Sequence, residues 1–293
     1  MTTEERVRAA IGAFTDAPVG TIRPLGGGFY GRVFLADADE GIVVKLYLFP
    51  NLARREALQL ETLARRGRVR MPKVYFASDD ALLMEYIPGE NAGHVSDIPA
   101  PSRRRVAEEI VESLIIWHGV RNPEGFGELD APSFEKDFRD FYHPIAAAVR
   151  DKAQILHERG ALDRQTMAAF DRSLERFWDI FSLPIRDARL IHGDYNTWNV
   201  LLAEDLSHVR AVIDPFGCRW TDPEFDLYQL DNANGRMYGL HELYGKMRAL
   251  SDNYPQKRAF YELYTELNHF YDAGVSLQKS NIPAQAGTLA KYL

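Results

Sequence analysis

The stretch that decides the fold runs from residue 190 to residue 202 and reads Leu190-Ile191-His192-Gly193-Asp194-Tyr195-Asn196-Thr197-Trp198-Asn199-Val200-Leu201-Leu202. An apolar pair leads into a polar loop and an apolar run leads out of it, which predicts a strand, a tight loop and a second strand. Ala211-Val212-Ile213-Asp214-Pro215 follows and predicts a third strand that ends at Asp214. Asp194, Asn199 and Asp214 are therefore expected at neighbouring strand ends.

These oxygen-bearing side chains suit phosphoryl transfer. One carboxylate must orient the attacking hydroxyl and accept its proton, while an amide and a second carboxylate hold Mg²⁺ on the phosphates. The order Asp194, four residues, Asn199 and a later Asp214 is the order of the protein-kinase pattern. For the loop taken alone, an ordinary polar hairpin built from Asx turns is the alternative.

A glycine-rich segment lies upstream. Gly26, Gly28 and Gly31 match the pattern G-x-G-x-x-G. The residues that follow, Arg32-Val33-Phe34-Leu35, favour a strand rather than the helix that a dinucleotide-binding fold requires. We therefore predict a hairpin whose backbone amides approach phosphate oxygens, because no Cβ atom intervenes at glycine. A plain glycine hairpin is the alternative.

Lys45 follows the apolar run Ile42-Val43-Val44, and a lysine that points inward there needs a partner. The helix predicted over residues 51–66 offers Glu56 and Glu61. Glu56 shares the apolar stripe of that helix, so it is the predicted partner, whereas Glu61 is expected to be more exposed. In a kinase-type site such a lysine contacts the α- and β-phosphates. A solvated lysine in an edge strand is the alternative.

A break in pattern marks the predicted lobe boundary. Pro88-Gly89 ends the strand predicted over 81–87. We expect residues 1–87 to form an N-terminal ATP-binding lobe and residues 88–293 to form a C-terminal catalytic and substrate lobe. The backbone carbonyl of Glu85 and the backbone amide of Ile87 are expected to meet the adenine edge. Beyond the break, helical spacing predominates.

Composition limits the partners. The net charge of −7 does not favour nucleic acid, but it suits a cationic substrate, for which Asp222, Glu224 and Asp231 are candidate acidic residues. Asp222 also precedes Pro223, which predicts the start of a helix. The single cysteine, Cys218, allows no intramolecular disulfide, so a reducing, cytoplasmic setting is expected. Neither a signal peptide nor a bilayer-spanning apolar run is predicted, so no membrane partner is expected.

Three motifs together resemble the aminoglycoside phosphotransferase and fructosamine kinase superfamily: His192-Gly193-Asp194…Asn199, Ile213-Asp214-Pro215 and Asp222-Pro223-Glu224-Phe225-Asp226-Leu227. The resemblance implies an α+β, two-lobed protein-kinase-like fold, with an N-terminal antiparallel sheet, one main helix and a larger, mostly helical C-terminal lobe. It implies MgATP as the phosphate source, Asp194 as the catalytic base, and Asn199 and Asp214 as Mg²⁺ ligands. The residues that would serve ATP are Gly26, Gly28, Gly31, Lys45 and Glu56.

Within the superfamily, the fructosamine kinase branch is the most similar, because Leu267-Asn268-His269 resembles its C-terminal helix. That branch reads Leu-Trp-Ser-Gly between the catalytic Asp and Asn, whereas this chain has Tyr195-Asn196-Thr197-Trp198. We predict a kinase that transfers the γ-phosphate of ATP to a hydroxyl of a small fructosamine or ketosamine. An antibiotic phosphotransferase such as an aminoglycoside kinase, a choline-type kinase and a non-catalytic nucleotide-binding regulator are the alternatives. No expectation for the oligomeric state follows.

Overall fold

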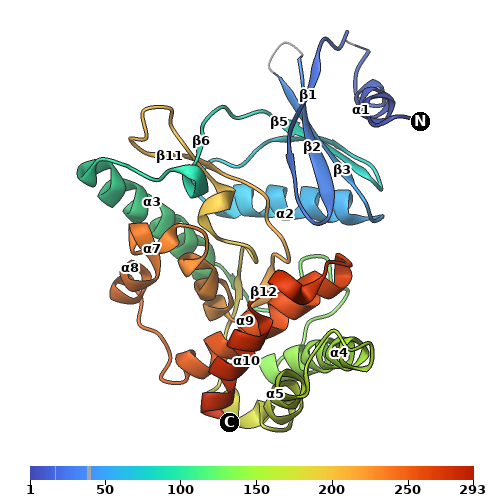
Figure 1. Ribbon diagram of the computed structural model, residues 1–293. Helices are drawn as coiled ribbons and strands as arrows, with labels where there is room; N and C mark the ends of the chain where they lie inside the picture. Colours follow the sequence, from blue (N-terminus) through green and yellow to red (C-terminus); the bar gives the residue numbers. More distant parts are fainter. Residues whose placement is uncertain (17, 38–40) are drawn as a thin grey trace. The chain divides into compact units, whose positions relative to one another are not determined.

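The computed structural model describes residues 1–16, 18–37 and 41–293 (Figure 1). The chain forms two compact units, each assembled from separate segments. The first unit comprises Met1–Trp117, His192–Cys218 and Asp231–Leu243, and the second comprises His118–Ile191, Arg219–Leu230 and Tyr244–Leu293. The loop 192–199 and Asp214 therefore belong to the same unit as the glycine-rich segment. The lobe boundary at residue 87 stays a prediction.

An antiparallel sheet dominates the first unit. Its strands lie in the order β1 (Ile22–Gly27), β2 (Gly31–Ala36), β3 (Ile42–Tyr47), β5 (Ala81–Glu85) and β4 (Val74–Ala77). Every residue of the central strand β3 is buried. Successive side chains of a strand point to opposite faces, so β3 can pack apolar side chains on one face and present Lys45 on the other.

The two faces of this sheet carry different helices. On one face, Val7 and Ile11 of α1 (Thr3–Gly12) pack with Val44 and Leu46 of β3. On the other face lies α2 (Leu52–Arg66), which crosses the lower part of the sheet in Figure 1 and contacts β3, β4 and β5. The alternation along β3 therefore directs Lys45 toward α2, the helix that carries Glu56.

The rest of the first unit holds the loop 192–199. A small sheet, in the order β11 (Val209–Val212), β10 (Val200–Leu202) and β6 (Glu90–Asn91), carries the loop at the start of β10. The long helix α3 (Ala100–Gly119) anchors its surroundings, because the Trp117 indole donates to the Leu63 carbonyl at 3.0 Å and the Tyr195 hydroxyl donates to the Ile110 carbonyl at 2.9 Å. The shorter elements are η1 (Ala92–His94), η2 (Thr197–Asn199), α7 (Gly235–Tyr238) and α8 (Leu240–Met247), the last of which continues into the second unit.

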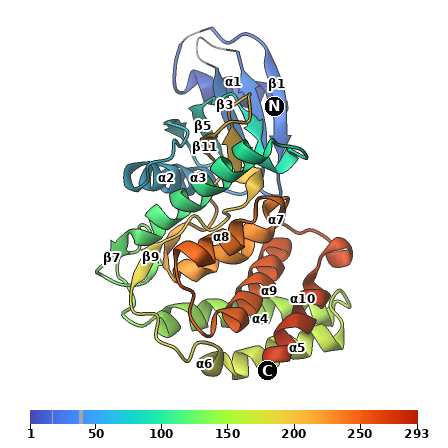
Figure 2. The same cartoon turned by 90° about the vertical axis from the view of Figure 1, so that its left-hand side faces the viewer.

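The second unit is mainly helical (Figure 2). Helix α9 (Tyr254–Asp272) packs against α4 (Phe138–Glu158) and α10 (Ile282–Leu289), and α5 (Arg164–Glu175) packs against α4 and α10. Aromatic side chains fill the core, with the rings of Phe260 and Tyr264 stacked at 3.9 Å. The remaining elements are α6 (Phe177–Ile180), β7 (Arg121–Asn122), β8 (Gly127–Glu128), β9 (Ala188–Leu190), β12 (Arg219–Thr221), η3 (Pro223–Asp231), η4 (Leu277–Lys279) and η5 (Ala290–Tyr292).

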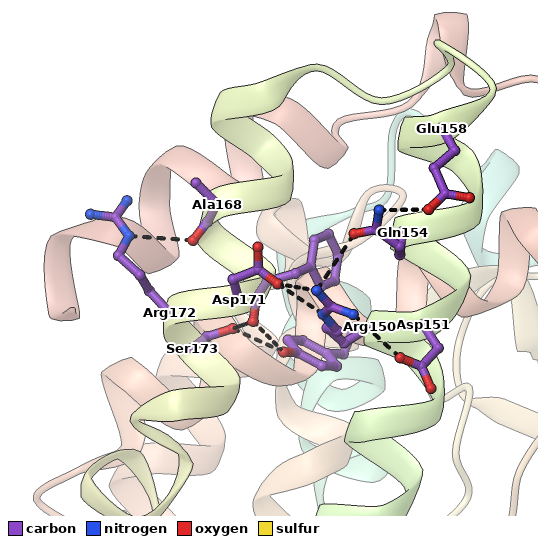
Figure 3. A network of polar contacts seen from close by, with 10 residues as sticks. Arg150, Asp151, Gln154, Glu158, Ala168, Asp171, Arg172 and Ser173 are labelled. Carbon is purple, nitrogen blue, oxygen red and sulfur yellow. Dashed lines mark hydrogen bonds and ion pairs between the residues drawn. The ribbon is translucent and has the colours of Figure 1, made fainter.

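Polar contacts tie the outer helices of the second unit together. The guanidinium of Arg150 on α4 donates to Asp171 on α5 at 2.8 Å (Figure 3). The amide of Gln154 donates to Glu158 one turn further along α4, also at 2.8 Å. The first contact links two helices and the second lies within one helix, and because both are at the surface they add little to the stability of the unit. Among residues 1–16, 18–37 and 41–293, no helix has the length and apolar character needed to cross a membrane.

Candidate functional site

The loop 192–199 exposes few side chains. Within this fully described stretch, all residues are buried except Asp194, which is partly exposed, and Trp198, which is 45% exposed. Gly193 permits the turn, because its φ of +88° is left-handed and a Cβ atom there would lie 2.1 Å from the Phe216 carbonyl oxygen. The close approach of these two backbone segments therefore fixes the turn that places Asp194 in the loop.

Two amide side chains hold the Asp194 carboxylate. Asn196 Nδ2 donates to one carboxylate oxygen at 2.7 Å, and Asn199 Nδ2 donates to the other at 3.0 Å. Asn199 also donates to the Asp194 carbonyl at 2.8 Å. The carboxylate thus has a defined orientation while its residue stays partly exposed, as a group that must meet an incoming hydroxyl requires.

Asp214 follows β11 and has unusual backbone geometry. Its φ of +55° is left-handed, although the residue is not glycine and stands directly before Pro215. Such a conformation costs about 1–3 kcal/mol and is characteristic of functional sites. The Asp214 carbonyl lies 3.5 Å from Asn199 Nδ2, and the backbone N–H of Ile213 donates to the Asn199 carbonyl at 2.9 Å. Asp214 is therefore linked to the loop that carries Asp194.

Lys45 joins Asp214 to α2. Its ammonium donates to Asp214 Oδ1 at 2.5 Å and to Glu56 Oε2 at 2.7 Å, so the structure contains the pair predicted with Glu56. Burial alone lowers the pKa of Lys45, but the carboxylates of Asp214 and Glu56 raise that pKa above its ordinary value. The ammonium therefore stays charged. Glu61 is exposed, as the spacing along α2 predicts.

Glu56 lies deeper than Lys45's other partner. Its side chain is 6% exposed, against 47% for Asp214. Burial raises the pKa of Glu56, and the neighbouring Lys45 ammonium opposes that change. A hydrogen bond from the Tyr47 hydroxyl reaches the same oxygen, Oε2, that accepts from Lys45. Sequence reasoning did not identify Tyr47, although its position two residues after Lys45 puts it on the same face of β3.

The glycine-rich segment forms the predicted hairpin between β1 and β2. The Gly28 N–H donates to the Gly31 carbonyl at 3.0 Å, which closes the turn. Gly31 is required sterically, since a Cβ atom would lie 2.6 Å from the Leu46 carbonyl oxygen, whereas a Cβ atom at Gly28 would meet nothing within 4 Å. Gly26 has a positive φ of +157°. The turn therefore leaves open space around Gly28.

An aromatic stack joins this hairpin to the segment after Asp214. The rings of Tyr30 and Phe216 are stacked at 4.7 Å with an interplanar angle of 16°. The Phe216 carbonyl is the group that approaches Gly193. The tip of the glycine hairpin is thus connected through Phe216 to the loop that bears Asp194.

The predicted adenine-binding positions lie at the end of β5. The Glu85 N–H donates to the Lys73 carbonyl at 2.9 Å, and the Glu85 side chain pairs with Arg70 at 2.5 Å. Ile87 is 5% exposed. Their contact with adenine stays a prediction.

The donor set fits Mg²⁺ held on a nucleotide. Such an ion is usually bound through one or two protein groups together with phosphate oxygens. The Asn199 amide nitrogen donates to Asp194, so the amide oxygen of Asn199 takes no part in that contact. The Asp214 carboxylate is about half exposed. An amide oxygen and a carboxylate are ligands that Mg²⁺ accepts.

Two of the acidic residues expected to attract a cationic substrate, Asp222 and Glu224, are buried and paired within the protein, so for them that expectation is wrong. Both are buried in the second unit, where the Lys257 ammonium donates to Asp222 Oδ2 at 2.8 Å and lies 2.6 Å from Glu224 Oε2. The Tyr261 hydroxyl donates to Asp222 at 2.7 Å. Burial lowers the pKa of Lys257, but its two carboxylate partners raise that pKa above the ordinary value. The Lys257 ammonium thus offsets one of the two carboxylate charges, and both carboxylates are enclosed within the second unit.

The element after Asp222 also differs from the prediction in kind. Pro223 opens a 3₁₀ helix, η3, and Asp222 caps it by accepting from the Glu224 N–H at 3.1 Å. Asp226, in this helix, lies 3.2 Å from the ring of His118, and both side chains are fully buried. His118 is therefore a packed residue, as its place on an apolar helix face indicates.

Comparisons with known proteins agree with this geometry. Residues 21–261 match the model of a family described as the phosphotransferase enzyme family. The chain is 24% identical over 205 residues to the uncharacterized protein YcbJ of Escherichia coli (strain K12), and the match spans 66% of this chain and 66% of that relative.

Solved structures of similar fold include two kinds of small-molecule kinase. A protein from Thermobifida fusca provisionally named fructosamine-3-kinase has a TM-score of 0.72 at 21% identity, covering 97% of this chain and 98% of that chain. The ADP-bound aminoglycoside phosphotransferase APH(2'')-Ib has a TM-score of 0.68 at 15% identity, covering 99% and 97%. These likenesses show a protein-kinase-like fold, which confirms the predicted fold class.

Proposed function

Because the chain belongs to the phosphotransferase enzyme family, we propose that it transfers the γ-phosphate of ATP to a hydroxyl group of a small sugar-amine molecule of the fructosamine type. The observation that carries the proposal is a continuous series of polar contacts, from Glu56 through Lys45, Asp214 and Asn199 to Asp194. It joins, within one unit, the residue types that phosphoryl transfer requires.

Each member of the series has a proposed role. Asp194 orients the acceptor hydroxyl and takes its proton, since its carboxylate is fixed by Asn196 and Asn199. Lys45 binds the α- and β-phosphates, with Glu56 holding its ammonium. The glycine hairpin offers backbone amides to the phosphates, and the backbone carbonyl of Glu85 and the backbone amide of Ile87 meet the adenine edge.

Asn199 and Asp214 would hold Mg²⁺, which supplies charge neutralisation on the transferred phosphate. Rate enhancement then comes from placing the hydroxyl against the phosphate and from fixed charges, without a covalent enzyme intermediate. We propose a reducing, cytoplasmic setting, because the sequence contains one cysteine, Cys218, and so allows no intramolecular disulfide.

The test follows ADP release from wild-type protein and from Asp194→Asn with fructosyl-lysine, an aminoglycoside and choline as acceptors. We expect wild type to use fructosyl-lysine. In Asp194→Asn we expect turnover to fall by about 10²–10⁴-fold, because the base is lost, while calorimetry finds ATP affinity nearly unchanged.

Three outcomes would contradict parts of the proposal. Full turnover in Asp194→Asn would remove the base assignment. Turnover with the aminoglycoside or choline, but not with fructosyl-lysine, would move the acceptor to another class. Binding of ATP by wild type without transfer or hydrolysis would indicate a nucleotide-binding regulator.

A further inference from the structure

Tyr47 forms a hydrogen bond to the buried pair of Lys45 and Glu56. It lies on β3 two residues after Lys45, is 4% exposed, and its hydroxyl donates to Glu56 Oε2. Lys45 donates to the same oxygen at 2.7 Å. One carboxylate oxygen of Glu56 therefore accepts hydrogen bonds from both Lys45 and Tyr47. Of these two, Lys45 is the proposed phosphate ligand.

The other carboxylate oxygen of Glu56 shows why this matters. Among the described residues, Oε1 is buried and has no hydrogen-bond partner. The orientation of the Glu56 carboxylate therefore depends on the two bonds to Oε2. Without the tyrosine hydroxyl, Lys45 would be the remaining bond that resists rotation about the last side-chain torsion of Glu56, a torsion with a broad preference of its own.

Lys45 is itself divided between two carboxylates. Its ammonium lies 2.5 Å from Asp214 Oδ1 and 2.7 Å from Glu56 Oε2. If the Glu56 carboxylate moves away, its attraction for the Lys45 ammonium weakens. The attraction of Asp214 then draws the ammonium toward Asp214. The tyrosine hydroxyl therefore opposes a shift of Lys45 toward Asp214.

We propose that Tyr47 is a positioning residue for phosphoryl transfer: through Glu56 it holds the Lys45 ammonium where the phosphates of a nucleotide bind. This inference rests on the proposed function, since it takes Lys45 as a phosphate ligand. The Tyr47 hydroxyl bonds to Glu56 and would act on the nucleotide only through Lys45, so its removal should weaken the binding of ligands whose phosphates Lys45 contacts. Loss of affinity should therefore be seen with ATP and not with adenosine, which has no phosphate.

The test compares Tyr47→Phe with wild type by titration calorimetry, using ATP with MgCl₂ and, separately, adenosine. We expect the ATP dissociation constant to rise about three- to tenfold, the effect of losing one hydrogen bond of ordinary net strength. We expect the adenosine dissociation constant to change less than about twofold. Tyr238→Phe is the matched control, because the Tyr238 hydroxyl is buried in the same unit and has no hydrogen-bond partner among the described residues.

A double-mutant cycle tests the route through Lys45. In a Lys45→Ala background, Tyr47→Phe should cause no further loss of ATP affinity. Equal losses with ATP and adenosine, an undiminished loss in the Lys45→Ala background, or unchanged ATP affinity in Tyr47→Phe would each overturn the positioning role. Absence of ATP binding by wild type would instead overturn the proposed function, so the two failures are distinguishable. Thermal unfolding of Tyr47→Phe shows whether the variant is folded at the assay temperature.

Discussion

Replacing Lys257 with methionine tests how much its ammonium, placed between two buried carboxylates, contributes to the free energy of unfolding. Lys257 is 2% exposed, Asp222 is 2% exposed and Glu224 is 8% exposed. Methionine keeps most of the apolar stem but removes the ammonium, which leaves two carboxylates without their cation. Removing one partner of a buried ion pair costs about 3–5 kcal/mol, because the remaining charge is uncompensated.

Hydrogen bonds that survive the substitution set the magnitude within that range. Asp222 keeps the Tyr261 hydroxyl and the Glu224 N–H, and Glu224 keeps the backbone N–H and the hydroxyl of Ser251 at 2.6 and 2.7 Å. Four donors therefore still serve the two carboxylates, so we expect a loss of about 3–5 kcal/mol rather than twice that amount.

Urea unfolding at pH 7, followed by far-ultraviolet circular dichroism, measures the loss in free energy of unfolding. Lys291→Met is the matched control, because Lys291 is exposed and its replacement should change stability by less than about 0.5 kcal/mol. A loss below about 1 kcal/mol in Lys257→Met would refute the reasoning, since it would mean that the carboxylates are reached by water or are neutral in the folded protein.

Other substitutions probe the loop and its surroundings. Gly193→Ala should cost about 1–3 kcal/mol of backbone strain and reduce turnover, since its Cβ atom would lie 2.1 Å from the Phe216 carbonyl oxygen; urea unfolding and an ADP-release assay measure both effects. Phe216→Ala removes the stack with Tyr30, worth about 0.5–1.5 kcal/mol, so stopped-flow fluorescence should find nucleotide release roughly two- to tenfold faster. Burial lowers the pKa of His118 below its ordinary value of 6.5. As the pH falls through about 6.5, the unfolded chain therefore binds a proton that the folded protein does not, and stability should fall by up to about 1.4 kcal/mol per pH unit. Urea midpoints at pH 7.5 and 5.5 measure this slope, and an equal slope in His118→Asn would contradict it.

Much of the site could be predicted because its residues lie on regular elements. Glu56 was distinguishable from Glu61 because helical periodicity places one on the apolar stripe and the other in solvent, and only Glu56 pairs with Lys45 in the structure. The strand before Asp214 was readable from its apolar run, whereas Asp194 does not stand at a strand end: it lies in the loop between β9, which ends at Leu190, and β10, which begins at Val200. Alternation along β3 also placed Tyr47 on the face of Lys45, but periodicity does not reveal which hydrogen bond a side chain makes.

Prediction from local sequence patterns fails for Asp222 and Glu224, the acidic residues that follow β12. Asp222 and Glu224 are polar residues beside a predicted helix start, a pattern that indicates exposure. Their partner, Lys257, lies on α9, 35 residues after Asp222. A contact of that sequence separation is set by tertiary packing, and no local pattern indicates that a lysine on an amphipathic helix turns inward. Recognition of a cationic acceptor therefore has to use residues other than these two.

Residues 195–198 depart from the fructosamine kinase pattern, and the structure shows which of these four side chains are buried and which one is exposed. Tyr195 points inward to the Ile110 carbonyl, Asn196 holds the Asp194 carboxylate, and Thr197 is fully buried. Changes at Tyr195 and Thr197 therefore alter how the loop is supported. Trp198 is the departing residue that reaches solvent, with its ring edge-on to His94 at 4.7 Å. A difference in acceptor that arises from this loop is therefore expected to act through Trp198, or through Asn196 and the orientation of the Asp194 carboxylate.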